Sequence, residues 1–183
     1  ICAIATRRPH TAREAMVIAY GDDEHAVEAD SPGKVSAAIE AGKIAITSAE
    51  TLVTTPEIDV VIDATGKPGV AADFDLLAME HGKHLVMMNV EADVTIGAYL
   101  QSEAKRLGVV YTLGAGDEPS SCMELINFVT GLGYPIVAAG KGKNNPLNID
   151  ATPAEYMDEA RRRNMNPRML VEFVDGSKTM VEM

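Results

Sequence analysis

Three short apolar runs in the chain each end in a cluster of polar and small residues. They occupy residues 59–66, 83–93 and 108–119. Between them, apolar residues recur at helical spacing over 69–81 and 95–107. Near-continuous apolar strands that alternate with amphipathic helices predict an α/β fold with a parallel sheet buried on both faces. Ligands of such sheets bind beyond the carboxyl ends of the strands, where these polar clusters fall.

The same patterns predict further elements on both sides of the three runs. Before them we expect strands at 1–6 and 43–47, helices at 11–20 and 34–41, and an acidic loop over 21–33, with Thr11 and Glu14 forming a capping box. After them we expect a helix at 120–131, a strand at 136–139, a helix at 152–163, and an antiparallel hairpin of 169–174 with 179–183 around Asp175 and Gly176.

The change from parallel to antiparallel structure predicts two domains. We expect residues 1–115 to form a partial Rossmann-type NAD(P)-binding parallel sheet, and residues 116–183 to form part of an α+β catalytic domain. The chain begins inside a strand without a methionine, so we expect both ends to be cut from a longer protein. No G-x-G-x-x-G motif occurs, which fits a cofactor-binding domain only if its phosphate loop lies upstream.

Composition narrows the class of protein. The net charge of −11 argues against binding to nucleic acid or to an anionic membrane. Two cysteines, Cys2 and Cys122, are too few for a disulfide framework, and nothing resembles a zinc motif. No apolar run is long enough to span a bilayer and no signal peptide is present, so a cytoplasmic location is the default expectation.

Two segments are candidates for cofactor binding. Arg7 and Arg8 follow the first strand, where arginine can accommodate the extra phosphate of NADP, although a solvated surface pair is the alternative. Ala64, Thr65 and Gly66 end the first of the three runs, and such small residues let a cofactor approach the backbone. The same Thr-Gly pair also makes an ordinary turn.

The second run ends in a polar cluster with Asn89, Glu91 and Asp93. Many dinucleotide enzymes place nicotinamide-contacting and catalytic residues at such a strand end, so Asn89 is a cofactor-binding candidate and Glu91 a catalytic one. Helix capping by Asn89 or Asp93 is the alternative, and Thr95 could also provide it.

The third run leads to the strongest candidate site, the adjacent carboxylates Asp117 and Glu118. Their position after a glycine-rich bend suits general acid–base work or a divalent cation, and oxygen ligands favour Mg²⁺ or Mn²⁺ over Zn²⁺. An acidic helix start stabilised by the helix dipole is the alternative. Further on, residues 140–146 place Lys141, Lys143 and Asn145 in one loop, a plausible clamp for a phosphate or carboxylate or else a mobile surface loop.

Arg7-Arg8 and the segments 89–93, 114–119 and 140–146 together resemble the 1-deoxy-D-xylulose 5-phosphate reductoisomerase-like (DRL) family, often labelled predicted homoserine dehydrogenase. Family members are longer, with an NADP-binding domain, a catalytic domain and a C-terminal domain of the antifreeze-like type. The resemblance implies NADPH-dependent conversion of 1-deoxy-D-xylulose 5-phosphate to 2-C-methyl-D-erythritol 4-phosphate, an isoprenoid precursor, aided by a divalent cation.

The resemblance also implies roles for particular residues. Asp117 and Glu118 resemble the acidic metal-binding segment of ordinary reductoisomerases. Asn89 and Glu91 sit like that family's asparagine–lysine–glutamate segment, but Val90 replaces the lysine. The substrate phosphate would be held by Lys141, Lys143 and Asn145.

Two other functions remain open at this point. One is a homoserine-dehydrogenase-like NAD(P)-dependent oxidoreductase, which needs no metal-chelating acid pair. The other is a noncatalytic dinucleotide-binding sensor. In each enzyme case we expect a small-molecule substrate, phosphorylated in the first, and a homo-oligomer, most simply a dimer.

Overall fold

The computed structural model describes residues 1–116, 118–142 and 145–182. The strands of this part of the chain are β1 (Ala3–Ala5), β2 (Ala26–Glu28), β3 (Ile44–Thr47), β4 (Val60–Asp63), β5 (His84–Met87) and β6 (Tyr111–Leu113). Its helices are α1 (Pro9–Tyr20), α2 (Pro32–Glu40), α3 (Ala49–Thr54), α4 (Pro68–Glu80), α5 (Val90–Leu107), α6 (Glu118–Gly131), α7 (Met157–Arg162), α8 (Pro167–Val174) and α9 (Ser177–Glu182).

The strands form two three-stranded sheets, in the orders β1-β3-β2 and β4-β5-β6. Every strand pairing recorded for the described residues is parallel. This confirms the predicted α/β class with parallel sheets and a Rossmann-type arrangement. The described residues after β6 form helices only, where α+β structure was expected. Because parallel strands end at a common edge, β4, β5 and β6 bring their following loops together.

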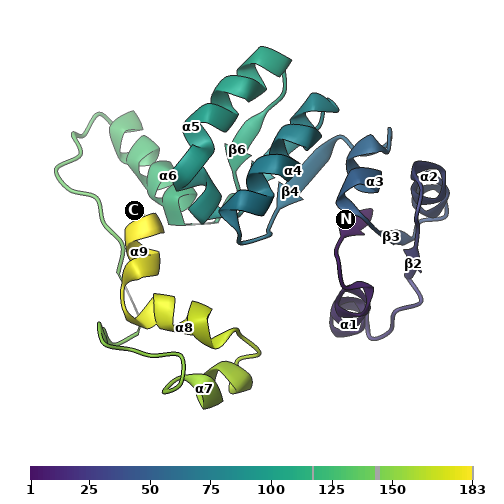
Figure 1. The fold of residues 1–183 in the computed structure, drawn as a ribbon. Coiled ribbons are helices and arrows are strands. Elements are labelled where there is room, and N and C mark those ends of the chain that lie inside the picture. Colours follow the sequence, from purple (N-terminus) through teal and green to yellow (C-terminus); the bar gives the residue numbers. More distant parts are fainter. Residues whose placement is uncertain (117, 143–144, 183) are drawn as a thin grey trace.

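One hydrophobic core serves both sheets. It joins Ala45 of β3 and Val53 of α3 to Leu85 and Met87 of β5, and α3 packs on both β1 and α4. Helices α4 and α5 pack on each other and lie beside the second sheet, where Leu100 is fully buried (Figure 1). The two sheets and their strand ends therefore belong to one packed unit.

The expected burial of both sheet faces does not hold along β4. Val61 and Asp63 are buried, whereas Val60 and Ile62 are 50% and 58% exposed. Alternate side chains of a strand point to opposite faces, and α4 contacts β4 and β5 on the buried one. An apolar run thus marks a strand here without requiring cover on both sides.

Helix starts differ from the predictions because other residues make the caps. Helix α5 begins at Val90, before the expected residue 95, since the Asn89 side chain accepts a hydrogen bond from the Ala92 N–H. The predicted capping box at Thr11 is wrong: α1 already begins at Pro9, and the Thr11 hydroxyl donates to the Arg8 carbonyl oxygen. Within the predicted acidic loop, Ala26–Glu28 forms the edge strand β2.

The largest error lies in the C-terminal part. The predicted hairpin is wrong, because its two segments form α8 and α9 instead. Leu170, Val171 and Val174 are buried at helical spacing, and Asn166 caps α8 ahead of Pro167. Residues 136–139 form no strand, and of the helix expected at 152–163 only α7 forms. Of the helices in the described ranges, none is both long and apolar enough to cross a membrane.

Candidate functional site

The ends of β4 and β5 are joined by a buried hydrogen-bond network. Asp63, the last residue of β4, accepts from the Thr65 N–H at 2.8 Å and from the Asn89 side-chain amide at 3.2 Å. The same Asn89 amide lies 3.2 Å from the Thr65 hydroxyl oxygen. Asp63 and Asn89 are each 1% exposed. The network therefore fixes two predicted cofactor-binding residues, Thr65 and Asn89, relative to each other.

The remaining residues of that strand end are open to solvent. Ala64, Thr65 and Gly66 are all exposed, and Gly66 has a positive φ of 65°, a conformation that favours glycine. The structure thus combines a fixed backbone with accessible small side chains at this edge. A ligand can reach these three residues without displacing a side chain.

A second group of acids lies beneath this edge. Asp75 of α4 is fully buried, and neither carboxylate oxygen has a hydrogen-bond partner among the described residues. Burial, with the nearby charge of Asp63, raises the pKa of Asp75 to about 7. Tyr111 donates a hydrogen bond to Asp93, and burial followed by that acceptor raises the pKa of the tyrosine.

Sequence reasoning missed Asp63 and Asp75 as parts of the site. Each had a signal: Asp63 is a carboxylate closing a buried strand, and Asp75 falls on the apolar stripe of α4 with Ala71, Ala78 and Met79. A charge at such a position requires a partner or a raised pKa. The helical spacing of apolar residues predicts the buried stripe of α4, but it does not predict that Asp75 is part of that stripe.

Glu91, the predicted catalytic residue, is paired with Lys178, which belongs to no motif singled out in the sequence. The Lys178 ammonium of α9 donates to the Glu91 carboxylate, and α9 packs against α5. Their side chains are 16% and 29% exposed. Val90 stands where the family resemblance would have a lysine, and here the amino group beside Glu91 comes instead from the C-terminal helix.

A second lysine–glutamate pair follows β6. Lys141 lies 2.7 Å from Glu118, so a predicted substrate-binding residue and a predicted metal ligand meet. Asp117 and Lys143 lie outside the described residues. Within the described ranges no group of three histidine, cysteine, aspartate or glutamate side chains could hold a metal ion. With Glu118 bound to a lysine, the part of this edge that the structure describes does not fit a divalent cation.

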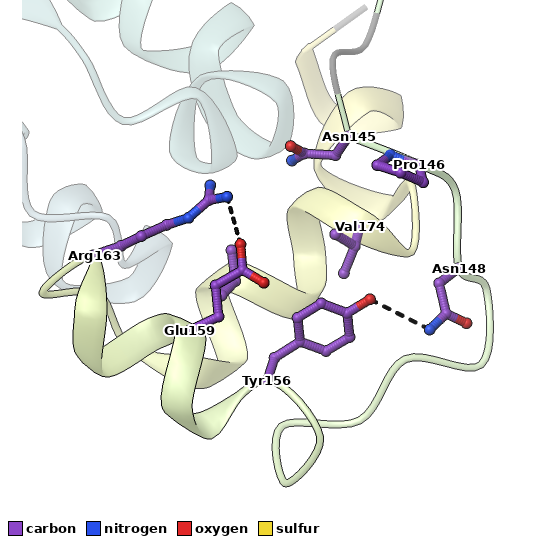
Figure 2. Close-up of a pocket in the computed structure, with 8 residues that line it drawn as sticks. Asn145, Pro146, Asn148, Tyr156, Glu159, Arg163 and Val174 are labelled. Carbon is purple, nitrogen blue, oxygen red and sulfur yellow. Dashed lines mark hydrogen bonds and ion pairs between the residues drawn. The ribbon is translucent and has the colours of Figure 1, made fainter.

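Asn145 has a different setting from Lys141. It lines a cavity of about 240 Å³ between the chain after residue 145 and helices α7 and α8 (Figure 2). An ion pair joins Arg163 to Glu159 in its wall, and the Asn148 amide donates to the Tyr156 hydroxyl at 3.4 Å. The structure thus assigns Lys141 and Asn145 different neighbours, and does not bring them together as one clamp.

The first sheet offers a more open site at its own carboxyl edge. Arg7 and Arg8 are exposed directly after β1. Beside them lies a cavity of about 340 Å³, lined by Thr6, Pro9, Glu28, Ala29, Asp30, Ile46, Thr47, Ser48 and Thr51. The Thr47 hydroxyl is buried and has no hydrogen-bond partner among the described residues. The cavity has room for a polar ligand, and Thr47 forms part of its lining.

Two family models match the chain. Residues 2–113 match the model of the homoserine dehydrogenase NAD-binding domain, and residues 116–183 match that of the oxidoreductase DRL catalytic domain. A solved structure of yvaA from Bacillus subtilis, an inferred oxidoreductase, is 16% identical with a TM-score of 0.42; the match covers 80% of this chain but only 44% of that one. No curated protein matches the chain. The chain therefore belongs to the homoserine dehydrogenase NAD-binding domain family over residues 2–113, and the segment after it is similar to the DRL catalytic domain.

Proposed function

We propose that this chain is the nucleotide-binding and partial catalytic region of an NADPH-dependent enzyme that converts 1-deoxy-D-xylulose 5-phosphate to 2-C-methyl-D-erythritol 4-phosphate. The reaction rearranges the carbon skeleton and then reduces the resulting aldehyde. It needs a bound pyridine nucleotide, a cationic site for the substrate phosphate and a group that protonates the oxygen of the carbonyl being reduced. Each requirement has candidate residues at the strand ends.

The observation that carries the proposal is the pairing of cations with carboxylates after β5 and β6. In a chain of net charge −11, Lys178 and Lys141 are drawn to this edge by Glu91 and Glu118. Lysine ammonium groups at a ligand edge suit a phosphorylated carbonyl substrate. Both lysines come from the segment that matches the DRL catalytic domain.

The nucleotide is expected to lie along both carboxyl edges. Arg7 and Arg8 would bind the extra phosphate of NADPH, and the adjacent cavity with Thr47 would take the adenosine. Ala64, Thr65, Gly66 and Asn89 would contact the nicotinamide half. Lys141, with Lys143 and Asn145 as further candidates, would bind the substrate phosphate.

The proposal does not require a divalent cation, and the assay below therefore tests activity with and without one. Asp117 and Glu118 are its predicted ligands, but the described residues do not fit a metal site, so no step depends on it. Activity that survives a chelator would separate this protein from the ordinary reductoisomerases that it resembles.

A homoserine-dehydrogenase-like activity is the second candidate, because residues 2–113 match that family's NAD-binding domain. One assay on the full-length protein separates the two. NADPH oxidation is followed at equal concentrations of deoxyxylulose phosphate and aspartate semialdehyde, with Mg²⁺, Mn²⁺ or a chelator. We expect oxidation with deoxyxylulose phosphate. Oxidation with aspartate semialdehyde alone would contradict the proposal, and none with either would favour a noncatalytic sensor.

The proposal also covers the location, oligomeric state and partners of the protein. We expect a cytoplasmic homodimer that binds neither nucleic acid nor membrane, given the net charge of −11. Light scattering of the full-length protein would give a mass of two subunits, and a single-subunit mass would contradict this part of the proposal.

A further inference from the structure

We propose that Lys178 protonates the substrate oxygen during the reduction, and that Glu91 holds Lys178 in place. The inference rests on the proposed reduction of a carbonyl group at this edge. Glu91 then acts through Lys178 and is a positioning residue. Contacts, burial and chemistry each support this division of roles.

The contact joins two distant parts of the chain. Lys178 and Glu91 are 87 residues apart in sequence, yet the ammonium donates to the carboxylate. Glu91 lies in the first turn of α5, and Lys178 lies in α9, which packs on both α5 and α8. Because both side chains start from packed helices, the ammonium is held at a defined place.

Burial distinguishes this pair from an ordinary surface ion pair. The Lys178 side chain is 16% exposed, whereas that of Lys34 on α2, which pairs with Asp30 just before the helix, is 62% exposed. Exposed pairs of the second kind contribute little to stability. A shielded ammonium that still keeps some access can meet a ligand with little competition from water.

The pair also stands next to the proposed cofactor site. Asn89, two residues before Glu91, caps α5 and bonds to both Asp63 and Thr65. The same strand end therefore carries the proposed cofactor contacts and, two residues later, the carboxylate that holds the Lys178 ammonium. Cofactor and acid would approach the substrate from the same edge of the sheet.

The chemistry balances with a single proton from Lys178. The carbonyl carbon would take a hydride from the pyridine nucleotide proposed to bind at this edge. As that bond forms, the π electrons of the carbonyl move to its oxygen, which takes a proton from Lys178 Nζ and becomes a hydroxyl. The neutral amine regains a proton from water before the next turnover. An arginine could hold the ion pair but could not give up a proton.

Substitution of Lys178 in the full-length protein separates this role from a structural one. Lys178→Arg is expected to keep the ion pair and the melting temperature yet to lower kcat by about 10²- to 10⁴-fold, with KM for NADPH unchanged. Lys178→Ala is expected to lose activity that added methylamine partly restores. Lys34→Arg is the matched change in an exposed ion pair, and it should leave kcat, KM for NADPH and the melting temperature unchanged.

Chemical labelling gives a readout that does not depend on turnover. In the ligand-free protein, acetylation of Lys178 by acetic anhydride, followed by mass spectrometry, is expected to quicken severalfold in Glu91→Gln, while labelling of Lys34 stays constant. Equal labelling in both proteins would overturn the positioning role. Full activity of Lys178→Arg would overturn the proton-donor role alone. A wild-type protein that turns over neither carbonyl compound would overturn the proposed function and this inference with it.

Discussion

The two carboxyl edges of the molecule are built in opposite ways. After β1 and β3, the edge is open: Arg7 and Arg8 are exposed and a cavity lies beside them. We call the edge after β4 and β5 closed because Asp63 and Asn89 are buried there in one hydrogen-bond network, although residues 64–66 remain exposed. An open edge with exposed cations can select among ligands, whereas a closed one holds a few groups at fixed positions. The difference predicts that substitutions at the closed edge change stability and those at the open edge change cofactor preference.

The largest expected effect comes from Asp75, the buried carboxylate beneath the closed edge that has no hydrogen-bond partner in the described part of the chain. Its pKa is raised from 3.8 to about 7, so the folded state favours the protonated form and loses stability as pH rises between these values. The shift corresponds to about 4 kcal/mol at neutral pH and above. Asp75→Asn removes this dependence. Urea unfolding of both proteins at pH 4 and pH 8 should show the variant gaining relative stability at pH 8; parallel pH curves would contradict it.

The next effect comes from Asp63, which joins the two strand ends. Asp63→Ala leaves the Thr65 N–H and the Asn89 amide without this acceptor, and we expect a loss of about 3 kcal/mol in the free energy of unfolding. NADPH affinity, measured by fluorescence, should fall as well. Asp59→Ala, an exposed aspartate just before the same strand, is the matched control and should leave both quantities unchanged. Wild-type stability in Asp63→Ala would show that the network is not needed.

At the open edge we expect a smaller effect that concerns ligand choice. The double variant Arg7→Ala, Arg8→Ala should raise KM for NADPH about 10-fold, equal to about 1.4 kcal/mol, and leave KM for NADH and the melting temperature unchanged. The physical reason is the loss of cations that face the extra phosphate. A parallel rise in KM for both nucleotides would mean that these arginines do not discriminate between them.

The smallest effect is expected at Thr47, whose buried hydroxyl has no partner among the described residues. Thr47→Val is close in shape and removes the unpaired group, so the ligand-free protein should gain about 1 kcal/mol. If a nucleotide uses this hydroxyl, NADPH affinity should fall at the same time. Calorimetry with and without NADPH measures both changes, and a lower melting temperature of the free variant would contradict the assignment.

The parallel strands and main helices of the first 113 residues were predictable because their apolar spacing is regular. The runs ending at Asp63, Met87 and Leu113 are strands. Gly82 and Gly108 follow the two helices that lie between these strands. The short elements were not predictable on the same basis. The strand β2 has only three residues, and its apolar positions are filled by alanine and valine among acids.

The C-terminal part shows why period alone misleads over short segments. Residues 169–174 form a nearly continuous apolar run that suits a strand, yet Pro167 and the Asn166 cap start a helix there. A six- to eight-residue segment fits both periods, and packing against neighbours decides between them. Local sequence patterns do not predict the role of Lys178 either, because its contact with Glu91 joins α9 to α5 across 87 positions of the chain.

One measurement bears most directly on the central claim that a single pyridine nucleotide lies across both edges. Amide hydrogen exchange of the full-length protein would be followed by mass spectrometry with and without saturating NADP⁺. We expect slowed exchange at Arg7 and Arg8 together with Thr65 and Gly66, and no change in helix α2, which serves as the internal control. Protection confined to one edge, or absent from both, would contradict the claim.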